Sequence, residues 1–424
     1  MPGYFHRRPA KEVLDKLAAR ALVANDGKNV IAVAAVDHIG LSRETVNAAK
    51  ARVRELAGIE PENVLIGCSH IHQGGPYAGD ELKQDKDYAE FVINRIADTI
   101  VLASQRLKPA ELYFGDGKLE GYSFCRIYNM EGGGLQTNPF GMNTKSSISE
   151  KHRTVLGPYR DIDKSVHVVD IRVNGKTAGV LVNFTCHCDV VGSETAVSAD
   201  FPGELRRCIK EKYGQDTAVL YLQGPCGNIN HIDAFHVEET KHSTRYLEMG
   251  RALAEEAMRI MAQAAPAENT DVRAAGEDVD IPLKIPSGEQ VAWAEKTIAA
   301  VKEDLKSLCE FDHDQVDLFF AKKIRDEYKR QEKSRKIFLQ AIQIGELCIY
   351  ASPGELFSEY GDEIIAGSPF KRKWVAAYSN DQVGYIVAPD CMVPGVYEAR
   401  QTIFPPEGGA MMNKELLRLG NTLI

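Results

Sequence analysis

Two tight turns between apolar runs constrain the fold of this chain more than any other feature of its sequence. Asn25-Asp26-Gly27 joins the runs 19–24 and 30–36, and Asn174-Gly175 joins two more. Asn-Gly and Asp-Gly at such positions are typical of β-hairpins, because these residues adopt the positive φ angles that short hairpin turns need. The sequence therefore predicts antiparallel hairpins at 19–36 and 166–184, and a further one at 338–351.

Helix signals lie between the hairpins. Ser42 is a suitable N-cap for a helix that ends at Gly58, and a second amphipathic helix is predicted over 87–107. The apolar sides are predicted to carry Val46, Ala49, Val53 and Leu56 in the first helix and Phe91, Ile93, Ile96 and Ile100 in the second. Because hairpins alternate with helices, we expect an α/β fold with a mixed β-sheet covered by helices. No repeat or break in composition divides the chain, so residues 1–424 are predicted to form a single large domain.

Two segments depart from this alternation. Residues 128–165 are rich in Gly, Asn, Thr, Ser and Pro without a sustained period, so we expect a long surface loop there. Residues 287–335 are charged, and their pattern predicts a helical excursion. That excursion would be a solvated helical pair packed on the sheet, a lid, or a contact within a homo-oligomer.

The composition excludes several classes of partner. A formal net charge of -9 is opposite in sign to a nucleic-acid footprint, so no nucleic-acid partner is expected. No run reaches the roughly 18 apolar residues that a membrane span needs, and no apolar stretch follows the basic residues near the N-terminus. We therefore expect a cytoplasmic protein without a membrane span, with nine reduced cysteines and a small-molecule substrate.

The segment Ser69-His70-Ile71-His72 follows a predicted buried strand at 64–68. In an extended strand, residues two apart point to the same side, so His70 and His72 are expected to face one cleft. Imidazole nitrogens are common metal ligands, but two histidines at a polar strand end also satisfy ordinary hydrogen bonds. On these residues alone, both interpretations stand.

A third histidine, His187, lies between Cys186 and Cys188 after another buried strand. Alternation along an extended segment would turn the two thiols away from the side that His187 occupies, and buried reduced cysteines behave as small apolar residues. His187 is therefore either a further ligand or a packed histidine. A cysteine-based site that uses Cys186, Cys188 or Cys226 is another alternative, and it requires an environment that stabilises a thiolate.

Glu355 and two tyrosines are the remaining candidates. Glu355 follows Pro353-Gly354 at a predicted helix start, where the helix dipole also favours a carboxylate. Tyr385 and Tyr397 fit equally well as ordinary core or interface aromatics.

Taken together, these segments resemble the neutral/alkaline non-lysosomal ceramidases, over the N-terminal catalytic domain of that family. The order and spacing of the matching segments agree over nearly the whole chain. They are Asn63-Val64-Leu65-Ile66 followed by Ser69-His70-Ile71-His72-Gln73-Gly74-Gly75-Pro76, Asp161-Ile162-Asp163-Lys164, Asn183-Phe184-Thr185-Cys186-His187, Ala199-Asp200-Phe201-Pro202-Gly203, Gln223-Gly224-Pro225-Cys226-Gly227-Asn228, Ser352-Pro353-Gly354-Glu355, and Tyr385 with the later Tyr397-Glu398. With the expected cytoplasmic location, the chain is predicted to be a short, cytoplasmic, bacterial-type homologue with a single catalytic domain.

The resemblance also implies a set of site residues. It assigns one Zn²⁺ per chain to His70, His187, Glu355 and Tyr385, and it places His72, Arg126 and Tyr397 at the reacting centre. Imidazole, carboxylate and phenolate ligands suit zinc, which activates water and polarises a carbonyl group. The three other residues would stabilise an oxyanion or protonate the leaving group. The implied reaction is hydrolysis of an acyl bond.

The polar character of residues 128–165 argues against the apolar wall that a ceramide chain would need. The polar side chains there include Asn129, Gln136, Thr137, Asn138, Asn143, Thr144 and Lys145. We therefore expect a zinc-dependent hydrolase of a small polar, carbohydrate- or cyclitol-like metabolite, acting on an amide, ester, lactone or activated ketone. The alternatives are an N-acyl amidase of ceramidase type that acts on lipid-like amides, and a non-catalytic ligand-binding protein that retains the fold.

Overall fold

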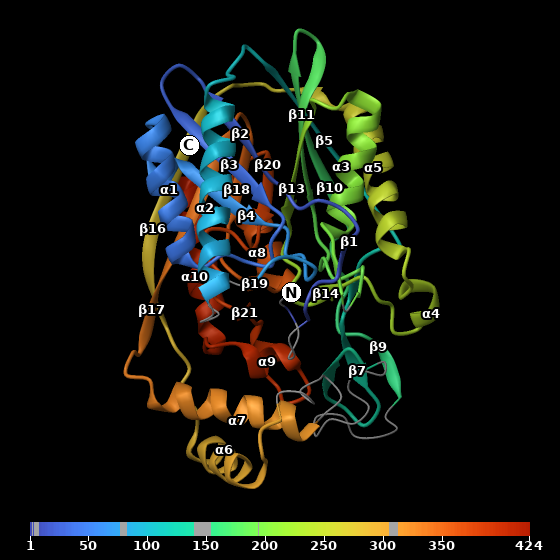
Figure 1. The fold of residues 1–424 in the computed structure, drawn as a ribbon, viewed down its shortest axis with the longest axis vertical. Coiled ribbons are helices and arrows are strands. Elements are labelled where there is room, and N and C mark those ends of the chain that lie inside the picture. Colours follow the sequence, from blue (N-terminus) through green and yellow to red (C-terminus); the bar gives the residue numbers. More distant parts are fainter. Residues whose placement is uncertain (2, 4–7, 77–82, 140–153, 194, 305–312) are drawn as a thin grey trace.

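Three sheets build the core of the protein (Figure 1). The computed structural model describes residues 1, 3, 8–76, 83–139, 154–193, 195–304 and 313–424. The core sheets have the strand orders β2-β3-β4, β13-β11-β10-β5-β15 and β16-β17-β18-β20. The bounds of their strands are β2 (Ala19–Asn25), β3 (Val30–Val36), β4 (Val64–Cys68), β5 (Glu111–Lys118), β10 (Ser165–Val173), β11 (Lys176–Phe184), β13 (Ala218–Gln223), β15 (Ala265–Pro266), β16 (Val272–Pro282), β17 (Ser334–Ile344), β18 (Leu347–Ala351) and β20 (Arg372–Ala376).

The predicted hairpins are confirmed. β2 and β3 pair in antiparallel fashion, as do β10 and β11, and β17 and β18. At the tip of the second hairpin, Asn174 and Gly175 have φ angles of 52° and 73°, the left-handed values that a tight turn requires. Each hairpin also supplies one strand to a parallel pair, namely β3 with β4, β11 with β13, and β18 with β20. The sheets are therefore mixed, as predicted, although the core contains three sheets instead of one.

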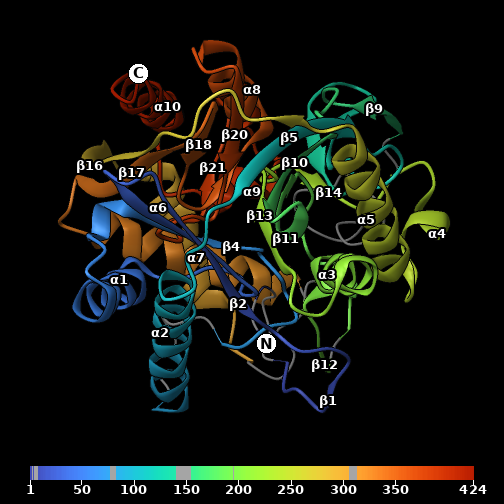
Figure 2. The ribbon, with the colours of Figure 1, turned by 90° about the horizontal axis from the view of Figure 1, so that it is seen from above.

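Helices cover the outer faces of these sheets, as the view in Figure 2 shows. α1 and α2 pack against the β2-β3-β4 sheet, α3 and α5 against the sheet that contains β10, and α8 and α10 against the sheet that contains β17. Their bounds are α1 (Arg43–Ala57), α2 (Lys83–Ser104), α3 (Asp200–Tyr213), α5 (Arg245–Gln263), α8 (Ser358–Gly367) and α10 (Pro406–Asn421). The predicted α/β class is confirmed.

An apolar layer fills the space between the three sheets. Val33 of β3, Leu181 of β11 and Ile349 of β18 point into it and belong to one buried cluster. The neighbouring Ala32 and Val180 point the opposite way and pack beneath helices. Because successive side chains of a strand alternate between its faces, strands that are buried on both faces consist of continuous apolar runs.

The two predicted helices are present, but in each of them one residue that was predicted to face the core is exposed instead. Ser42 accepts a hydrogen bond from the Thr45 amide at the start of α1, and Gly58 ends the helix with a φ of 67°. Leu56 of α1 is 48% exposed and Phe91 of α2 is 56% exposed. Phe91 precedes the buried-face residue Ile93 by two positions, which is about 200° around a helix, so it lies on the outer side.

The prediction of a long surface loop over 128–165 is wrong for the described residues. Three short strands form a small sheet there, and β10 already begins at Ser165. They are β7 (Ile127–Met130), β8 (Leu135–Thr137) and β9 (Val155–Pro158). Strands of this length are too short to give a recognisable period. Asn143, Thr144 and Lys145 lie outside the described residues.

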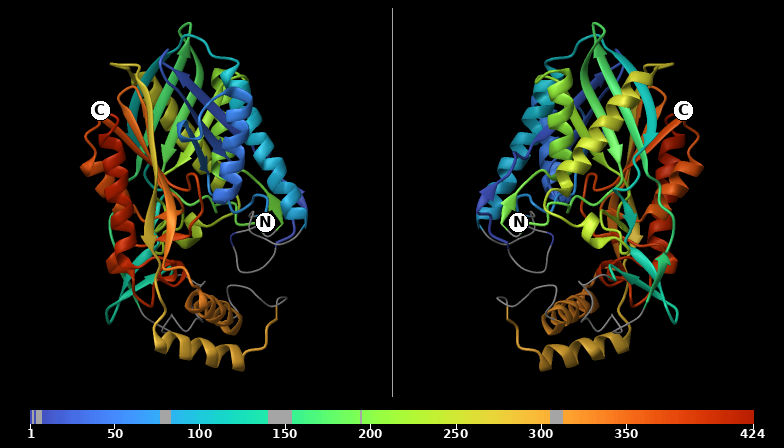
Figure 3. Two further views of the ribbon diagram at one scale, coloured as in Figure 1. Left: turned by 90° about the vertical axis from the view of Figure 1, so that its left-hand side faces the viewer. Right: turned by 90° about the vertical axis from the view of Figure 1, so that its right-hand side faces the viewer.

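The helical excursion predicted at 287–335 is present as α6 (Gly288–Ala300) and α7 (His313–Lys329), whereas Ser334 and Arg335 belong to β17. Figure 3 shows the two helices at one end of the molecule, beyond the sheets. The Phe320 ring of α7 lies edge-on to Tyr397, with 6.2 Å between the ring centroids. Tyr397 opens the short helix α9 (Tyr397–Gln401), so the pair packs against α9.

Within the described part of the chain, no helix combines the length and the apolar character needed to cross a membrane. The single domain over 1–424, the homo-oligomer and the cytoplasmic location stay predictions.

A buried ion pair links the β2-β3-β4 sheet to helix α3, which covers the neighbouring core sheet. Asp37 follows β3, and its carboxylate accepts hydrogen bonds of 2.9 and 2.6 Å from the two terminal nitrogens of Arg206 in α3. The two side chains are only 4% and 7% exposed. A buried arginine that loses its counter-charge is strongly destabilising, because the cation stays desolvated.

We predict that Asp37→Asn lowers the free energy of unfolding by about 3–5 kcal/mol, since it leaves the Arg206 guanidinium buried beside a neutral group. Urea denaturation followed by circular dichroism measures this change. Asp98→Asn is the matched control, because Asp98 pairs with Arg95 on an exposed face of α2. Equal effects of the two substitutions would contradict the importance of the buried pair.

Candidate metal centre

The candidate centre lies where strands from all three core sheets end. His70 comes shortly after β4, His187 shortly after β11, and Glu355 shortly after β18. Each of these strands belongs to a parallel pair. Segments that leave the carboxyl ends of parallel strands meet at one edge, which is where α/β proteins commonly bind ligands.

The backbone brings His70 and His72 together by a route that differs from the predicted one. The expected extended strand is absent, because His70 has a φ of 62° and lies in the left-handed region. The chain turns sharply there, and Ile71 then forms an isolated parallel bridge with Cys188. The two imidazoles nevertheless face each other, with 3.3 Å between their Nε2 atoms.

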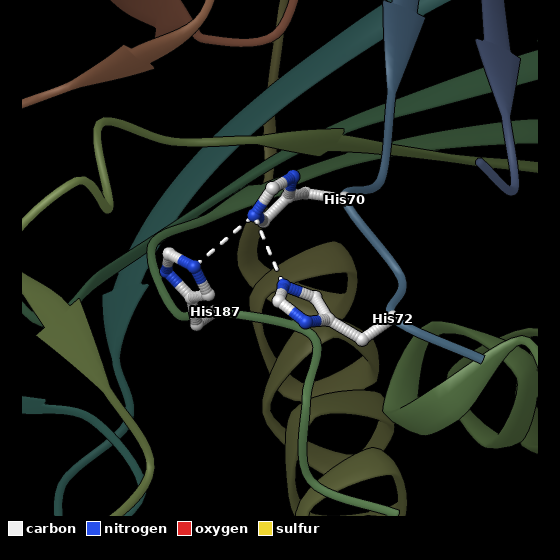
Figure 4. Close-up of side chains that lie close together, drawn as sticks. All are labelled: His70, His72 and His187. Atoms are coloured by element: carbon white, nitrogen blue, oxygen red, sulfur yellow. Dashed lines mark hydrogen bonds between the residues drawn. The ribbon is translucent and has the colours of Figure 1, made fainter. Parts of the chain in front are cut away.

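His70, His72 and His187 form a buried group of imidazoles (Figure 4). Nε2 of His70 lies 3.1 Å from Nε2 of His187, and the ligand atoms of all three rings lie within 4.8 Å of one another. Burial lowers the pKa of His70 and His187 well below the ordinary histidine value and lowers that of His72 to about 3. Neutral imidazoles, the form that binds metals, are therefore favoured.

Backbone carbonyl groups fix the tautomers of two of these rings. Nδ1 of His70 lies 2.6 Å from the Ile39 carbonyl oxygen, and Nδ1 of His187 lies 3.1 Å from that of Cys226. A carbonyl oxygen can only accept, so each Nδ1 carries the proton and each Nε2 carries a lone pair. The lone pairs of His70 and His187 thus point at each other, an arrangement that is repulsive without a cation.

Glu355 adds a carboxylate to this group. Its Oε2 lies 3.6 Å from Nε2 of His70 and 3.7 Å from Nε2 of His187, and this buried oxygen has no hydrogen-bond partner among the described residues. Burial raises the pKa of Glu355 to about 7, although Arg126 opposes this effect. The prediction that Glu355 opens a helix is wrong, because it lies in the short strand β19 (Glu355–Leu356) and α8 begins at Ser358.

Strand pairing places Tyr385 beside Glu355. β21 (Tyr385–Ile386) runs parallel to β19, with Tyr385 directly opposite Glu355, and the Tyr385 hydroxyl group opposes the rise in the pKa of Glu355. Nη2 of Arg126 donates to the Tyr385 hydroxyl group at 3.0 Å and to the Gly227 carbonyl group at 2.8 Å. Arg126 follows β6 (Phe124–Cys125), which pairs with β14 (Ile229–Asn230).

Tyr397 lies one ring further out than the other candidates. Its ring centroid is 6.0 Å from that of Tyr385, and its hydroxyl oxygen accepts a hydrogen bond of 2.8 Å from Gln401.

The structure thus brings all seven residues that the sequence singles out into one neighbourhood. His70, His187 and Glu355 form its centre, and His72, Tyr385, Arg126 and Tyr397 surround them.

Sequence reasoning missed two groups around this centre. Arg8 is 2% exposed and donates to the His72 carbonyl oxygen at 2.6 Å, and Gly3 lies so close to the His72 ring that an added Cβ would be 2.3 Å from Nδ1. Glu398 lies 2.6 Å from Nε of Arg126 and is fully buried. Glu398 was part of a matching motif, whereas nothing in the sequence near Arg8 pointed to His72.

The cysteines near the centre do not provide ligands to the group. Cys186 and Cys188 are fully buried in an apolar cluster behind His187. Burial raises the pKa of both thiols well above the ordinary value and raises that of Cys226 to about 12. These environments oppose a thiolate, so they count against a cysteine-based site.

We predict that Gly227→Ala disturbs the centre through Glu355. An added Cβ would lie 2.5 Å from the Glu355 carbonyl oxygen and 2.9 Å from that of Leu356, so the backbone that carries the carboxylate must move. The expected loss of unfolding free energy is about 1–3 kcal/mol, as measured by urea denaturation. Gly157→Ala is the control, because an added Cβ there meets nothing within 4 Å. Identical stability of the two variants would contradict the tight approach.

Known proteins were compared with the chain by sequence and by structure. No protein-family model and no curated protein sequence matches it. Among solved structures, neutral ceramidase from Pseudomonas aeruginosa matches with a TM-score of 0.71 at 16% identity, over 96% of this chain and 68% of the ceramidase chain. A structure described as ceramidase complexed with C2 matches with a TM-score of 0.73 at 17% identity, over 99% of this chain and 72% of the other. The chain therefore has the fold of the neutral ceramidases, as its resemblance to that family implied.

Proposed function

We propose that this chain is a zinc-dependent hydrolase of ceramidase type that cleaves a carboxamide bond. The observation that carries the proposal is the pair of imidazole lone pairs that face each other across 3.1 Å, with the unpartnered Glu355 oxygen beside them. The structural likeness to neutral ceramidases supports a hydrolase with this architecture.

The residues fit a zinc ion. His70 and His187 would each bind through Nε2, and their Nδ1–H groups, held by backbone carbonyl groups, set that orientation. Glu355 would add a carboxylate oxygen and Tyr385 a phenolate oxygen. Two nitrogen and two oxygen ligands suit zinc, and a site with a further open position is typical of zinc hydrolases. When bound, zinc would supply Lewis acidity toward a carbonyl group and toward water.

The surrounding residues would act on the substrate. Arg126 keeps its charge, because Glu398, Tyr385 and Glu355 outweigh the desolvation of the buried guanidinium and raise its pKa well above the ordinary value. A fixed cation beside the centre would stabilise the negative charge that develops on the carbonyl oxygen. The Tyr397 hydroxyl group, whose oxygen accepts from Gln401, would protonate the leaving group. His72 would hold or move a proton at Nε2, which faces the other two rings.

A small polar metabolite is the second candidate substrate. Next to Arg126, the Asn230 amide donates to the Asn138 side-chain oxygen at 3.0 Å, and the Asn138 amide donates to the Arg126 carbonyl oxygen at 2.8 Å. Such a pair offers hydrogen bonds to a hydroxylated substrate and no apolar surface to an acyl chain. Thr137 and Gln136 of the same segment are buried, as is Asn230.

We predict different effects for the two histidines of the Ser69–His72 segment. His70→Ala, His187→Ala and Glu355→Ala should each lose zinc, because each removes a ligand. His72→Ala should keep zinc and lose about 100-fold in kcat, because it removes proton transfer. Zinc per chain is measured by mass spectrometry of the purified variants. The control is His167→Ala, because His167 pairs with Asp116 outside the centre.

Equal loss of zinc from the His70 and His72 variants would contradict this division. A folded wild-type protein that binds no zinc would favour the non-catalytic alternative.

A substrate panel tests the bond that is cleaved. We expect release of amine from a short-chain N-acylsphingosine or from an N-acetylated amino sugar, whereas a sugar lactone should react poorly. A zinc chelator should abolish turnover, and iodoacetamide should not, since the thiols near the centre are buried. Cleavage of the lactone alone would replace the amidase by a hydrolase of small polar cyclic substrates. Loss of activity on alkylation would support the cysteine-based alternative.

A further inference from the structure

A carboxylate that none of the proposed catalytic steps uses lies in contact with Arg126. Oε1 of Glu398 is 2.6 Å from Nε of Arg126, with side-chain exposures of 0% and 8%. The Nε–H bond is not aligned with Oε1, so the contact is an ion pair and not a linear hydrogen bond. A buried ion pair is weakly screened, and removal of either partner leaves an uncompensated charge.

The other oxygen of Glu398 is held by Thr137. The Thr137 hydroxyl group donates to Oε2 at 2.6 Å, and its oxygen also accepts from the Tyr397 amide at 3.2 Å. The Thr137 amide in turn donates to the Gly395 carbonyl oxygen at 3.1 Å. These contacts tie β8 to the start of α9, so the carboxylate cannot turn away from Arg126 without breaking its hydrogen bond from Thr137.

We infer that Glu398, held by Thr137, is a positioning residue that fixes the guanidinium of Arg126 relative to Tyr385 and Tyr397. Glu398 is bonded directly to Tyr397 along the chain and paired in space with Arg126, so one buried carboxylate sets the distance between the two groups that would act on the substrate. This inference rests on the proposed function to the extent that Arg126 and Tyr397 act in catalysis.

The need for such a residue follows from the charges around Arg126. Its Nη2 donates to Tyr385 and to the Gly227 carbonyl group, while Nε faces Glu398, so contacts on two sides define the plane of the guanidinium. Glu355 is the other carboxylate that acts on this cation. Without Glu398, the guanidinium would be drawn toward Glu355 and away from the orientation that suits an oxyanion.

Glu204 provides a comparison within the same protein. Its side chain is 5% exposed between α3 and α5, and it pairs with Arg207 and Arg251, whose side chains are each 54% exposed and lie away from the centre. Glu398 and Glu204 are thus both buried carboxylates with arginine partners, and they differ in what their arginines contact. A substitution at Glu204 reports the structural cost of losing such a carboxylate.

The kinetic test is a double-mutant cycle with the amide from the panel that the wild-type protein cleaves. Glu398→Gln keeps the shape and removes the charge, and it should lower kcat about 10- to 100-fold with little change in KM and in zinc content. In an Arg126→Met background, Glu398→Gln should cause no further loss of kcat, because it acts through Arg126. Glu204→Gln should leave kcat unchanged. Thr137→Val, which keeps the charge and removes the two hydrogen bonds of the Thr137 hydroxyl group, should give a smaller loss and serves if Glu398→Gln fails to fold.

Two kinetic outcomes would overturn the inference. One is an equal loss of kcat from Glu398→Gln with and without Arg126, which would mean that Glu398 acts on the fold alone. The other is an unchanged kcat in a folded Glu398→Gln protein.

A second measurement does not depend on turnover. In protein labelled with ¹⁵N at arginine Nε, the buried Arg126 Nε–H should give a slowly exchanging resonance that is missing from Arg126→Met. We expect this resonance to shift and exchange faster in Glu398→Gln, and to be unchanged in Glu204→Gln. If the Arg126 resonance is the same in Glu398→Gln as in the wild-type protein, the inference is wrong, whether or not a substrate is found. If the resonance shifts and exchanges faster in Glu398→Gln but the wild-type protein hydrolyses no substrate, the proposed function is refuted and the positioning role is still supported.

Discussion

The centre depends on two hydrogen bonds from imidazole rings to backbone carbonyl oxygens. The carbonyl oxygens of Ile39 and Cys226 hold the protons of His70 and His187 on Nδ1, so that both Nε2 lone pairs point inward. The imidazole rings by themselves could not impose this, since a free imidazole exchanges its tautomers easily. The carbonyl groups belong to segments that leave β3 and β13, so the ligand geometry is set by the ends of core strands. Everything else at the centre is arranged around these lone pairs.

Much of the fold could be predicted from the sequence because its signals are local. Asn174-Gly175 and Asn25-Asp26-Gly27 specify their turns through the φ angles of a few residues, and Ser42 and Gly58 fix the ends of α1 through hydrogen bonds to near neighbours. The number of sheets could not be predicted in this way. Whether strands that are buried on both faces form one sheet or three depends on long-range packing, which leaves no periodic trace in the chain.

The site, like the fold, could be predicted from the sequence only in part. The seven residues were singled out because a family resemblance linked distant motifs, and the structure places them in one neighbourhood. The local arguments were less successful. His70 and His72 meet through a left-handed turn and not through strand alternation, and Glu355 is placed by pairing with β21 and not by a helix start. The roles of Arg8 and Thr137 could not be predicted, because each acts through hydrogen bonds to residues far away in the sequence.

The hairpin of β10 and β11 has a practical consequence. β11 is nine residues long, so its two ends are about 30 Å apart. Its far end carries the Asn174-Gly175 turn at one extremity of the molecule, and the near end leads to His187 (Figure 1). A fluorophore or a surface tether attached at this turn would leave the carboxyl ends of the strands facing the solution. Immobilised protein could then be used to follow the binding of metal and of candidate substrates without an attachment near the centre.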